Sequence, residues 1–256
     1  WGLSRPGKER VLLFLPLFVS AETIRTDGGV FHCRVPETYD ADSGIMVLFG
    51  GRDWPGDKTL AACGFSRLAD RHRLFLLAPS FKGRNYRQPE SGSGNLLKKA
   101  VGQLERRYGL KSQKLCFYGY SAGGECAALF YQWMPERVAA WGVHACGVYP
   151  VSIRCSLAPC LITCGLDDAE RFQISRGFIY RYREHGGLLL WKYFPDTGHE
   201  LSRQALELAE AWFDDLLSGR SIIAYGEDDT RKVPAKPDAA FSNPLYSEKL
   251  KELWRK

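Results

Sequence analysis

Short apolar runs alternate with longer amphipathic segments along most of this chain, and this alternation limits the possible folds more than any other feature. The apolar runs have the length and composition of strands: residues 23–25, 30–35, 45–49, 74–78, 114–120, 138–144, 160–164 and 188–194. Segments with helical periodicity lie between or after the later runs: residues 58–71, 95–108, 123–134, 169–185 and 203–217. The turn Asp27-Gly28-Gly29 predicts a hairpin between the first two strands. The later repeats predict a mostly parallel sheet with helices on both faces, which is a three-layer α/β fold.

Composition and charge exclude several classes of protein. Hydrophobic residues make up 45% of the 256 residues and charged residues 25%, so the chain can bury a core and a disordered state is not expected. No apolar run reaches the roughly 18 residues of a spanning helix, so we expect no stable membrane span. The net charge of +6 is scattered along the chain, and we therefore expect no nucleic-acid partner. The sequence does not indicate an oligomeric state.

Three parts of the chain differ in composition. Residues 1–21 combine a basic stretch, an apolar run at 11–19 and a small residue at Ala21, a pattern typical of a secretory signal cleaved after Ala21. This pattern predicts an exported protein, periplasmic or extracellular. The alternative is that the apolar run forms a buried strand, in which case a cytoplasmic protein is expected.

Residues 22–218 form the predicted α/β domain, and residues 219–256 form a C-terminal extension that we expect to pack on it. Large apolar side chains in the extension need cover from solvent. They are Phe241, Leu245, Tyr246 and Trp254.

The eight cysteines do not form a metal-binding pattern. No C-x-x-C pair occurs, and no histidine lies at zinc-finger spacing from the closest cysteines, so no metal site is predicted. Cys116 and Cys164 lie in apolar runs and are interpreted as small core residues. No organic cofactor is implied, and the sequence does not assign disulfides.

The segment Gly119-Tyr120-Ser121-Ala122-Gly123 matches the G-x-S-x-G motif of a serine nucleophile. An apolar strand-like run precedes it and a helical segment follows, which is the strand–turn–helix context that the motif requires. The small residues allow a sharp turn that would hold the Ser121 hydroxyl clear of the backbone. Ser121 is therefore the predicted nucleophile.

A serine hydroxyl needs a general base, and the base needs an acid that orients it. His199 lies on a glycine-containing loop between the last strand and the last helix, and we predict it to be the base. His144 ends a strand and could line the site, although a partly buried structural role is favoured. Asp167 and Asp168 both follow a late strand, and we prefer Asp168 because the order Ser121, Asp168, His199 fits one fold in particular.

The oxyanion of an acyl-transfer reaction needs two hydrogen-bond donors. The backbone N–H of Ala122, directly after the nucleophile, is the first candidate. The second is expected from the glycine-containing loop after the third strand, where the N–H of either Gly51 or Arg52 could serve.

Together these residues resemble the α/β-hydrolase family over residues 23–218. Within the family, the chain is similar to the secreted polyester depolymerases, feruloyl esterases and acetyl-xylan esterases. The similarity is carried by Val35-Pro36-Glu37-Thr38-Tyr39-Asp40, by the Gly-Tyr-Ser-Ala-Gly-Gly turn, and by Gly165-x-x-Asp168 with Arg171 three residues on. Where that group usually has His-Gly after the third strand, this chain has Phe49-Gly50 or Gly50-Gly51. The resemblance implies the fold, the triad and acyl-transfer chemistry.

Only about fifteen residues separate the strand ending at His144 from the next one, too few for a cap domain of several helices. We therefore expect an open site. Aromatic residues at the carboxyl ends of strands could form a shelf for a bulky or polymeric ester of the feruloyl, acetyl-xylan or polyester type. They are Trp54, Tyr86, Tyr120 and Tyr149.

The leading hypothesis is a serine carboxylesterase. A serine peptidase or an acyltransferase could use the same three residues, the acyltransferase by passing the acyl group to an alcohol instead of water. A catalytically silent, hydrolase-like binding module is the remaining alternative. It has no need of an intact Ser121, His199 and Asp168, and their presence disfavours it.

Overall fold

The computed structural model describes residues 21–83, 85–153, 157–228, 232–235, 237–238 and 242–256. Apart from Ala21, which opens the first strand, the predicted signal segment lies outside the described residues. Within the described residues, no helix combines the length and the apolar character needed to cross a bilayer.

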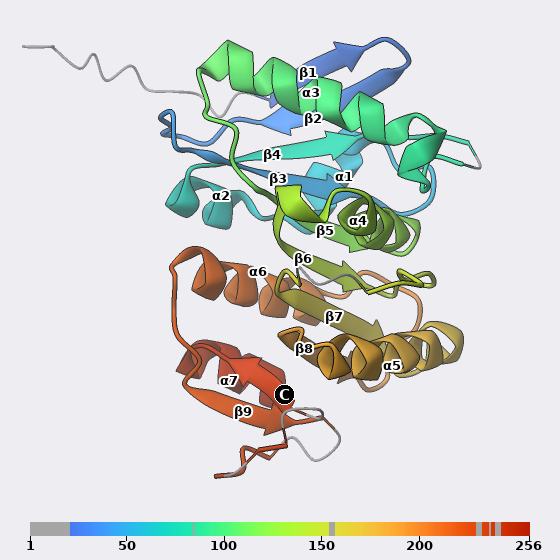
Figure 1. Ribbon diagram of the computed structural model, residues 1–256, viewed down its shortest axis with the longest axis vertical. Coiled ribbons are helices and arrows are strands. Elements are labelled where there is room, and N and C mark those ends of the chain that lie inside the picture. Colours follow the sequence, from blue (N-terminus) through green and yellow to red (C-terminus); the bar gives the residue numbers. More distant parts are fainter. Residues whose placement is uncertain (1–20, 84, 154–156, 229–231, 236, 239–241) are drawn as a thin grey trace, which may run out of the picture.

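An eight-stranded sheet forms the centre of the molecule (Figure 1), with the strand order β1-β2-β4-β3-β5-β6-β7-β8. β1 and β2 form the predicted hairpin, β2 pairs antiparallel with β4, and every pairing from β4 to β8 is parallel. The bounds are β1 Ala21–Thr26, β2 Gly29–Arg34, β3 Gly44–Phe49, β4 Leu74–Pro79, β5 Leu115–Tyr120, β6 Val138–His144, β7 Cys160–Gly165 and β8 Leu189–Phe194. The predicted three-layer α/β fold is confirmed.

Alternate residues of each central strand supply the two cores that hold the layers together. In β3, Ile45, Val47 and Phe49 face one core and Met46 and Leu48 face the other, as the period of two in a strand requires. The first core is covered by α3 (Ser93–Tyr108), α4 (Ala122–Trp133) and α5 (Ala169–Glu184). The second is covered by α1 (Gly56–Cys63), α2 (Ser66–His72), α6 (Arg203–Leu217) and α7 (Glu248–Arg255). Two short 3-10 turns, Pro89–Ser91 and Pro135–Arg137, precede α3 and β6.

The prediction of one helix over residues 58–71 is wrong, because this segment forms two helices, α1 and α2. α1 ends at Gly64, which has a left-handed backbone with φ of +65° and whose N–H bonds to the carbonyl of Leu60. Glycine adopts this conformation without steric cost, so it ends the first helix and redirects the chain into the second.

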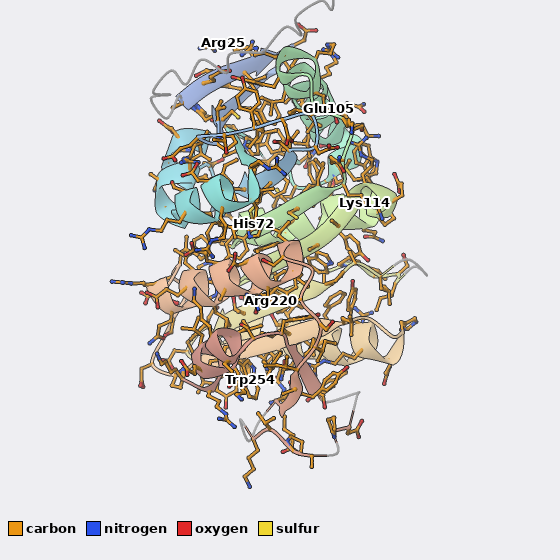
Figure 2. The ribbon with its side chains drawn as sticks, turned by 90° about the vertical axis from the view of Figure 1, so that its left-hand side faces the viewer. Arg25, His72, Glu105, Lys114, Arg220 and Trp254 are labelled. Atoms are coloured by element: carbon orange, nitrogen blue, oxygen red, sulfur yellow. The ribbon has the colours of Figure 1, made fainter. Side chains whose placement is uncertain are left out.

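The C-terminal extension adds a two-stranded sheet, β9 (Ala224–Glu227) with β10 (Ser242–Leu245), and the helix α7. Trp254 of α7 is 1% exposed, and its indole N–H donates to the carbonyl of Trp191 in β8 at 2.9 Å. Leu245 and Tyr246 are also buried, while Phe241 lies outside the described residues. Figure 2 shows Trp254 at the opposite end of the molecule from Arg25 of β1. The described part of the extension therefore covers the β8 end of the domain.

Candidate active site

Ser121 lies at the turn between β5 and α4, at the carboxyl edge of the sheet. Its φ of +56° is unusual for a residue with a side chain, and such strain is typical of a serine nucleophile on a strand-to-helix turn. The turn also presses against the end of β3, because a Cβ on Gly123 would lie only 2.1 Å from the carbonyl oxygen of Phe49. Glycine at this position is therefore a packing requirement of the turn.

The structure brings together the three residues of the predicted triad, each from a different strand end. The Oγ of Ser121 lies 2.8 Å from Nε2 of His199, and Nδ1 of His199 lies 2.6 Å from Oδ2 of Asp168. Because a carboxylate only accepts, Nδ1 carries the hydrogen, and Nε2 is left free to accept the hydroxyl proton of Ser121. This is the arrangement needed to activate a serine for attack on an acyl group.

Burial separates the two candidate aspartates. The Asp168 side chain is 4% exposed, whereas the side chain of its partner His199 is 37% exposed. Asp167 is exposed, and its backbone N–H donates to the carbonyl of Thr197. The second oxygen of Asp168 faces Arg171, whose guanidinium lies 3.5 Å away and also bonds to Glu170 at 2.9 Å. Asp168, and not Asp167, is therefore the aspartate that accepts the hydrogen bond from Nδ1 of His199.

The loop after β3 lies directly beside the nucleophile turn. Ala122 begins α4, so its N–H is one of the donors that a helix start leaves without a partner in the helix. Gly51 is buried, Arg52 is exposed, and the N–H of Trp54 closes the loop onto the carbonyl of Gly51 at 3.1 Å. A Cβ on Gly51 would touch the rings of Trp54 and Tyr120 at 3.2 and 3.4 Å. The loop after β3 thus packs against the nucleophile turn, where a Cβ on Gly123 would lie 2.3 Å from the carbonyl oxygen of Gly50.

Three of the four predicted aromatic residues lie around this edge. The Trp54 ring lies 5.6 Å from that of Tyr120, which in turn lies 5.6 Å from the imidazole of His199. Tyr86 is half-buried and packs against Phe81 at 6.0 Å. A small hollow beside Gly51 is lined by Trp54 and Tyr86. Phe81 and Tyr86 line both this hollow and a larger open groove of about 730 Å³.

Tyr149 is placed elsewhere. Its ring is 7% exposed, stacks on Phe178 of α5 at 4.5 Å, and its hydroxyl lies 2.9 Å from that of Ser175. The prediction that Tyr149 forms part of an aromatic shelf is therefore corrected: the residue belongs to the core beneath α5.

No protein-family model matches this sequence, and no curated protein sequence does so either. Solved structures do match. S-formylglutathione hydrolase (FrmB) from Staphylococcus aureus is 14% identical, with a TM-score of 0.63 over 76% of this chain and 95% of that one. LpqC, a poly(3-hydroxybutyrate) depolymerase from Bordetella parapertussis, is 15% identical, with a TM-score of 0.58 over 79% and 92%. Esterase PE8 is 19% identical, with a TM-score of 0.58 over 72% and 96%. The chain has the α/β-hydrolase fold.

The connection in which a cap was not expected runs from the end of β6 at His144 to the start of β7 at Cys160. The described residues 145–153 and 157–159 between β6 and β7 contain no helix. The described part of the chain therefore leaves the predicted open site without a large cap.

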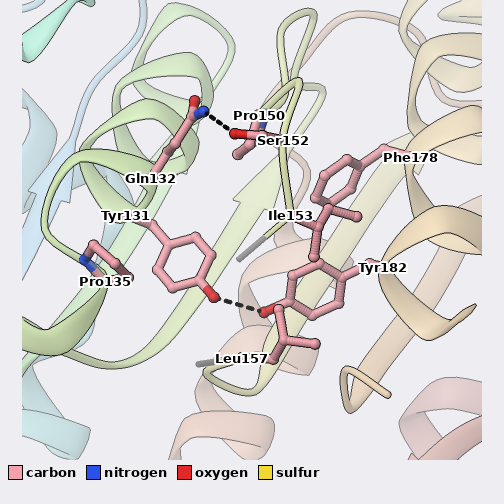
Figure 3. Close-up of a pocket in the computed structure, with 9 residues that line it drawn as sticks. All are labelled: Tyr131, Gln132, Pro135, Pro150, Ser152, Ile153, Leu157, Phe178 and Tyr182. Atoms are coloured by element: carbon pink, nitrogen blue, oxygen red, sulfur yellow. Dashed lines mark hydrogen bonds between the residues drawn. The ribbon is translucent and has the colours of Figure 1, made fainter. Parts of the chain in front are cut away.

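A second pocket lies away from the triad (Figure 3). It is formed by the last part of α4, the loop after β6 and the last part of α5. At its rim Gln132 donates to the hydroxyl of Ser152 at 3.1 Å, and the hydroxyls of Tyr131 and Tyr182 lie 3.2 Å apart. Among the described residues that line this pocket, none pairs a nucleophile with a base.

The described residues contain no cluster of His, Cys, Asp and Glu side chains that could hold a metal ion. The seven described cysteines are free and buried, and Cys155 lies outside the described residues. Burial raises the pKa of the Cys116 thiol to about 12, which keeps it protonated. These thiols are core residues of the α/β-hydrolase fold.

His144 has a buried structural position, as favoured from the sequence, and it lies beside the site because the N–H of Ser121 donates to its carbonyl at 2.9 Å. It is fully buried at the end of β6, with Nδ1 2.8 Å from Oγ1 of Thr163 and Nε2 2.8 Å from the carbonyl oxygen of Glu200. Burial lowers its pKa from 6.5 to about 4, so it is neutral at pH 7. Its position at a strand end was the only signal in the sequence, and Thr163, a polar residue within an apolar run, was missed.

Proposed function

We propose that this protein is a serine hydrolase that cleaves carboxylic esters through an acyl-enzyme on Ser121. The observation that carries the proposal is the unbroken chain of contacts from the Ser121 hydroxyl through His199 to the buried Asp168. A surface serine with no such partners would not be activated at neutral pH.

In the first half of the reaction, Ser121 Oγ attacks the ester carbonyl carbon while its proton passes to Nε2 of His199. The charge on the tetrahedral oxygen is stabilised by the N–H of Ala122 and by that of Gly51 or Arg52. His199 then donates the proton to the departing alkoxide, which leaves as the alcohol. Asp168 keeps the imidazole oriented and stabilises its charged form throughout.

In the second half, His199 removes a proton from water, and the resulting hydroxide attacks the acyl carbon. The proton returns to Ser121 Oγ as the acid leaves, which restores the starting state. An added alcohol could take the place of water, so the ratio of acid to new ester in its presence distinguishes hydrolysis from acyl transfer.

The surroundings of the triad favour a bulky or polymeric ester. No large cap closes the site within the described residues, and Trp54 and Tyr120 provide apolar rings next to His199. The open groove beyond Tyr86 has room for several more atoms of a substrate chain. Feruloyl, acetyl-xylan and polyester substrates are therefore the first to compare.

The test is to label the purified protein with a fluorophosphonate and to map the labelled peptide, with p-nitrophenyl acetate and butyrate turnover measured in parallel. We expect the label on Ser121, and Ser121→Ala should lose both label and turnover while it keeps the wild-type melting temperature. Folded wild-type protein that takes up no label and shows no turnover would refute the proposal and favour the binding-module alternative.

A further inference from the structure

The loop that carries His199 has little cover on its outer side. Pro195, Asp196, His199 and Glu200 are all exposed, and Gly198 is half-buried. Backbone bonding anchors the loop at one point before the histidine, where the N–H of Asp167 donates to the carbonyl of Thr197 at 3.0 Å. The position of the imidazole must therefore be set largely by contacts from the inner side.

His144 supplies one such contact. The carbonyl oxygen of Glu200, 2.8 Å from Nε2, can only accept, so Nε2 of His144 carries the hydrogen. Because the buried ring is neutral at pH 7, Nδ1 then has a free lone pair that can accept the one hydroxyl hydrogen of Thr163 at 2.8 Å. The carbonyl of Val143, at 3.2 Å from the same hydroxyl, is the competing acceptor, and the shorter contact favours the imidazole. Both nitrogens are satisfied, so the ring has one favoured orientation and aims one donor at the residue after His199.

Tyr120 supplies the second contact, on His199 itself. Its hydroxyl donates to the backbone carbonyl of His199 at 3.0 Å. Its ring centroid lies 6.0 Å from that of His144, with an angle of 22° between the rings, and 5.6 Å from that of His199, with an angle of 30°. The tyrosine ring thus contacts both the buried histidine at the end of β6 and the histidine beside Ser121.

We propose that His144 and Tyr120 are positioning residues for His199: they hold two successive carbonyls of its loop so that the imidazole rests between Ser121 and Asp168 before substrate arrives. This proposal rests on the proposed function, since it concerns the same base. Neither residue exchanges a proton with the substrate. They act through the backbone, and their effect is on the fraction of molecules with an assembled triad.

The test uses pairs of variants that differ by one contact. Tyr120→Phe removes the hydroxyl and keeps both ring contacts. His144→Gln places an amide N–H near the position of Nε2 and can still reach Glu200, whereas the shorter His144→Asn cannot. Tyr182→Phe is the matched control, because it also removes a buried phenol that donates to a carbonyl, that of Ala158 at 2.6 Å, at the other edge of the sheet. Each variant is compared with wild type in kcat and KM for p-nitrophenyl acetate, in fluorophosphonate labelling rate, and in melting temperature.

We expect kcat and labelling rate to fall by about 10- to 100-fold in Tyr120→Phe and His144→Asn, with KM changed by less than about threefold. His144→Gln should recover most of the loss, and Tyr182→Phe should lower the melting temperature without lowering kcat. If folded Tyr120→Phe keeps kcat within twofold of wild type, or if Gln and Asn at position 144 are equally active, the proposal is overturned. Should both position 144 variants fail to fold, Tyr120→Phe decides alone. Wild-type protein without label would instead refute the proposed function, so the two failures are distinct.

Discussion

The buried His144 should make the stability of this protein sensitive to mild acid. Its pKa is about 4 in the folded protein, chiefly because burial disfavours the charged ring, against an ordinary value of 6.5 in the unfolded chain. Between these two values the unfolded chain binds a proton that the folded protein does not. The free energy of unfolding therefore rises with pH in this interval, and the contribution of His144 is complete above about pH 6.5.

The size of the effect follows from the same two values. Each pH unit of the interval between about 4 and 6.5 is worth roughly 1.4 kcal/mol, so His144 alone should remove about 3 kcal/mol of stability as the pH falls from 7 to 4. Below about pH 4 the folded protein also takes up the proton, and this contribution stops changing. A loss of this size is a large part of the stability of an ordinary domain.

The loss of stability is measured by urea unfolding at pH values from 4 to 7 in steps of about half a pH unit. His144→Gln is the control, because glutamine does not titrate. The two proteins differ in absolute stability, so the comparison is between their slopes. We expect the slope of wild type to exceed that of His144→Gln by up to about 1.4 kcal/mol per pH unit near pH 5 to 6. Parallel curves would show that the pKa of His144 is the same in the folded and the unfolded chain, and the reasoning would be wrong.

Four further substitutions test other features of the structure. Asp168→Asn should lower kcat by about four orders of magnitude, while Asp167→Asn should lower it by less than about tenfold; equal losses in ester turnover would contradict the assignment of the acid. Gly123→Ala should destabilise the domain by more than about 3 kcal/mol, because the new Cβ would lie 2.1 Å from the carbonyl oxygen of Phe49; unchanged urea unfolding would contradict the contact. Trp254→Ala should cost about 3–5 kcal/mol, since the indole is 1% exposed; a loss below about 1 kcal/mol would mean that the C-terminal helix is not integral to the domain.

Periodicity was sufficient to predict the layers but not every break within them. The bounds predicted for the last helix, 203–217, agree with α6 because its apolar stripe is regular and Ser202 caps it. The prediction of one helix over 58–71 was wrong because the helix ends at Gly64, which has a left-handed backbone. The chain turns at this glycine so that both α1 and α2 can pack on the sheet. A single glycine within a helical pattern does not reveal this from sequence alone.

The three residues that the structure brings into contact could be proposed from the sequence, with the acid narrowed to two neighbouring aspartates. The motif around Ser121 and the order of the later residues were enough to propose the nucleophile and the base. Which of Asp167 and Asp168 faces the histidine depends on the direction in which the chain leaves β7. Because the two residues are adjacent and of the same type, the sequence does not indicate this direction. In the structure the first residue, Asp167, uses its N–H to hold Thr197 and the second, Asp168, turns inward.

The same contact explains why a glycine precedes the two aspartates. A Cβ on Gly165 would lie 2.1 Å from the carbonyl oxygen of Thr197 and 2.6 Å from that of Gly198, so any side chain there would push the His199 loop away from β7. The glycine therefore brings the loop of the base close enough to the loop of the acid for a 2.6 Å contact between His199 and Asp168. Gly165 and the His199 loop are about thirty residues apart in the sequence. The sequence around Gly165 therefore does not reveal that a side chain there would displace the loop, and only the folded structure shows this contact.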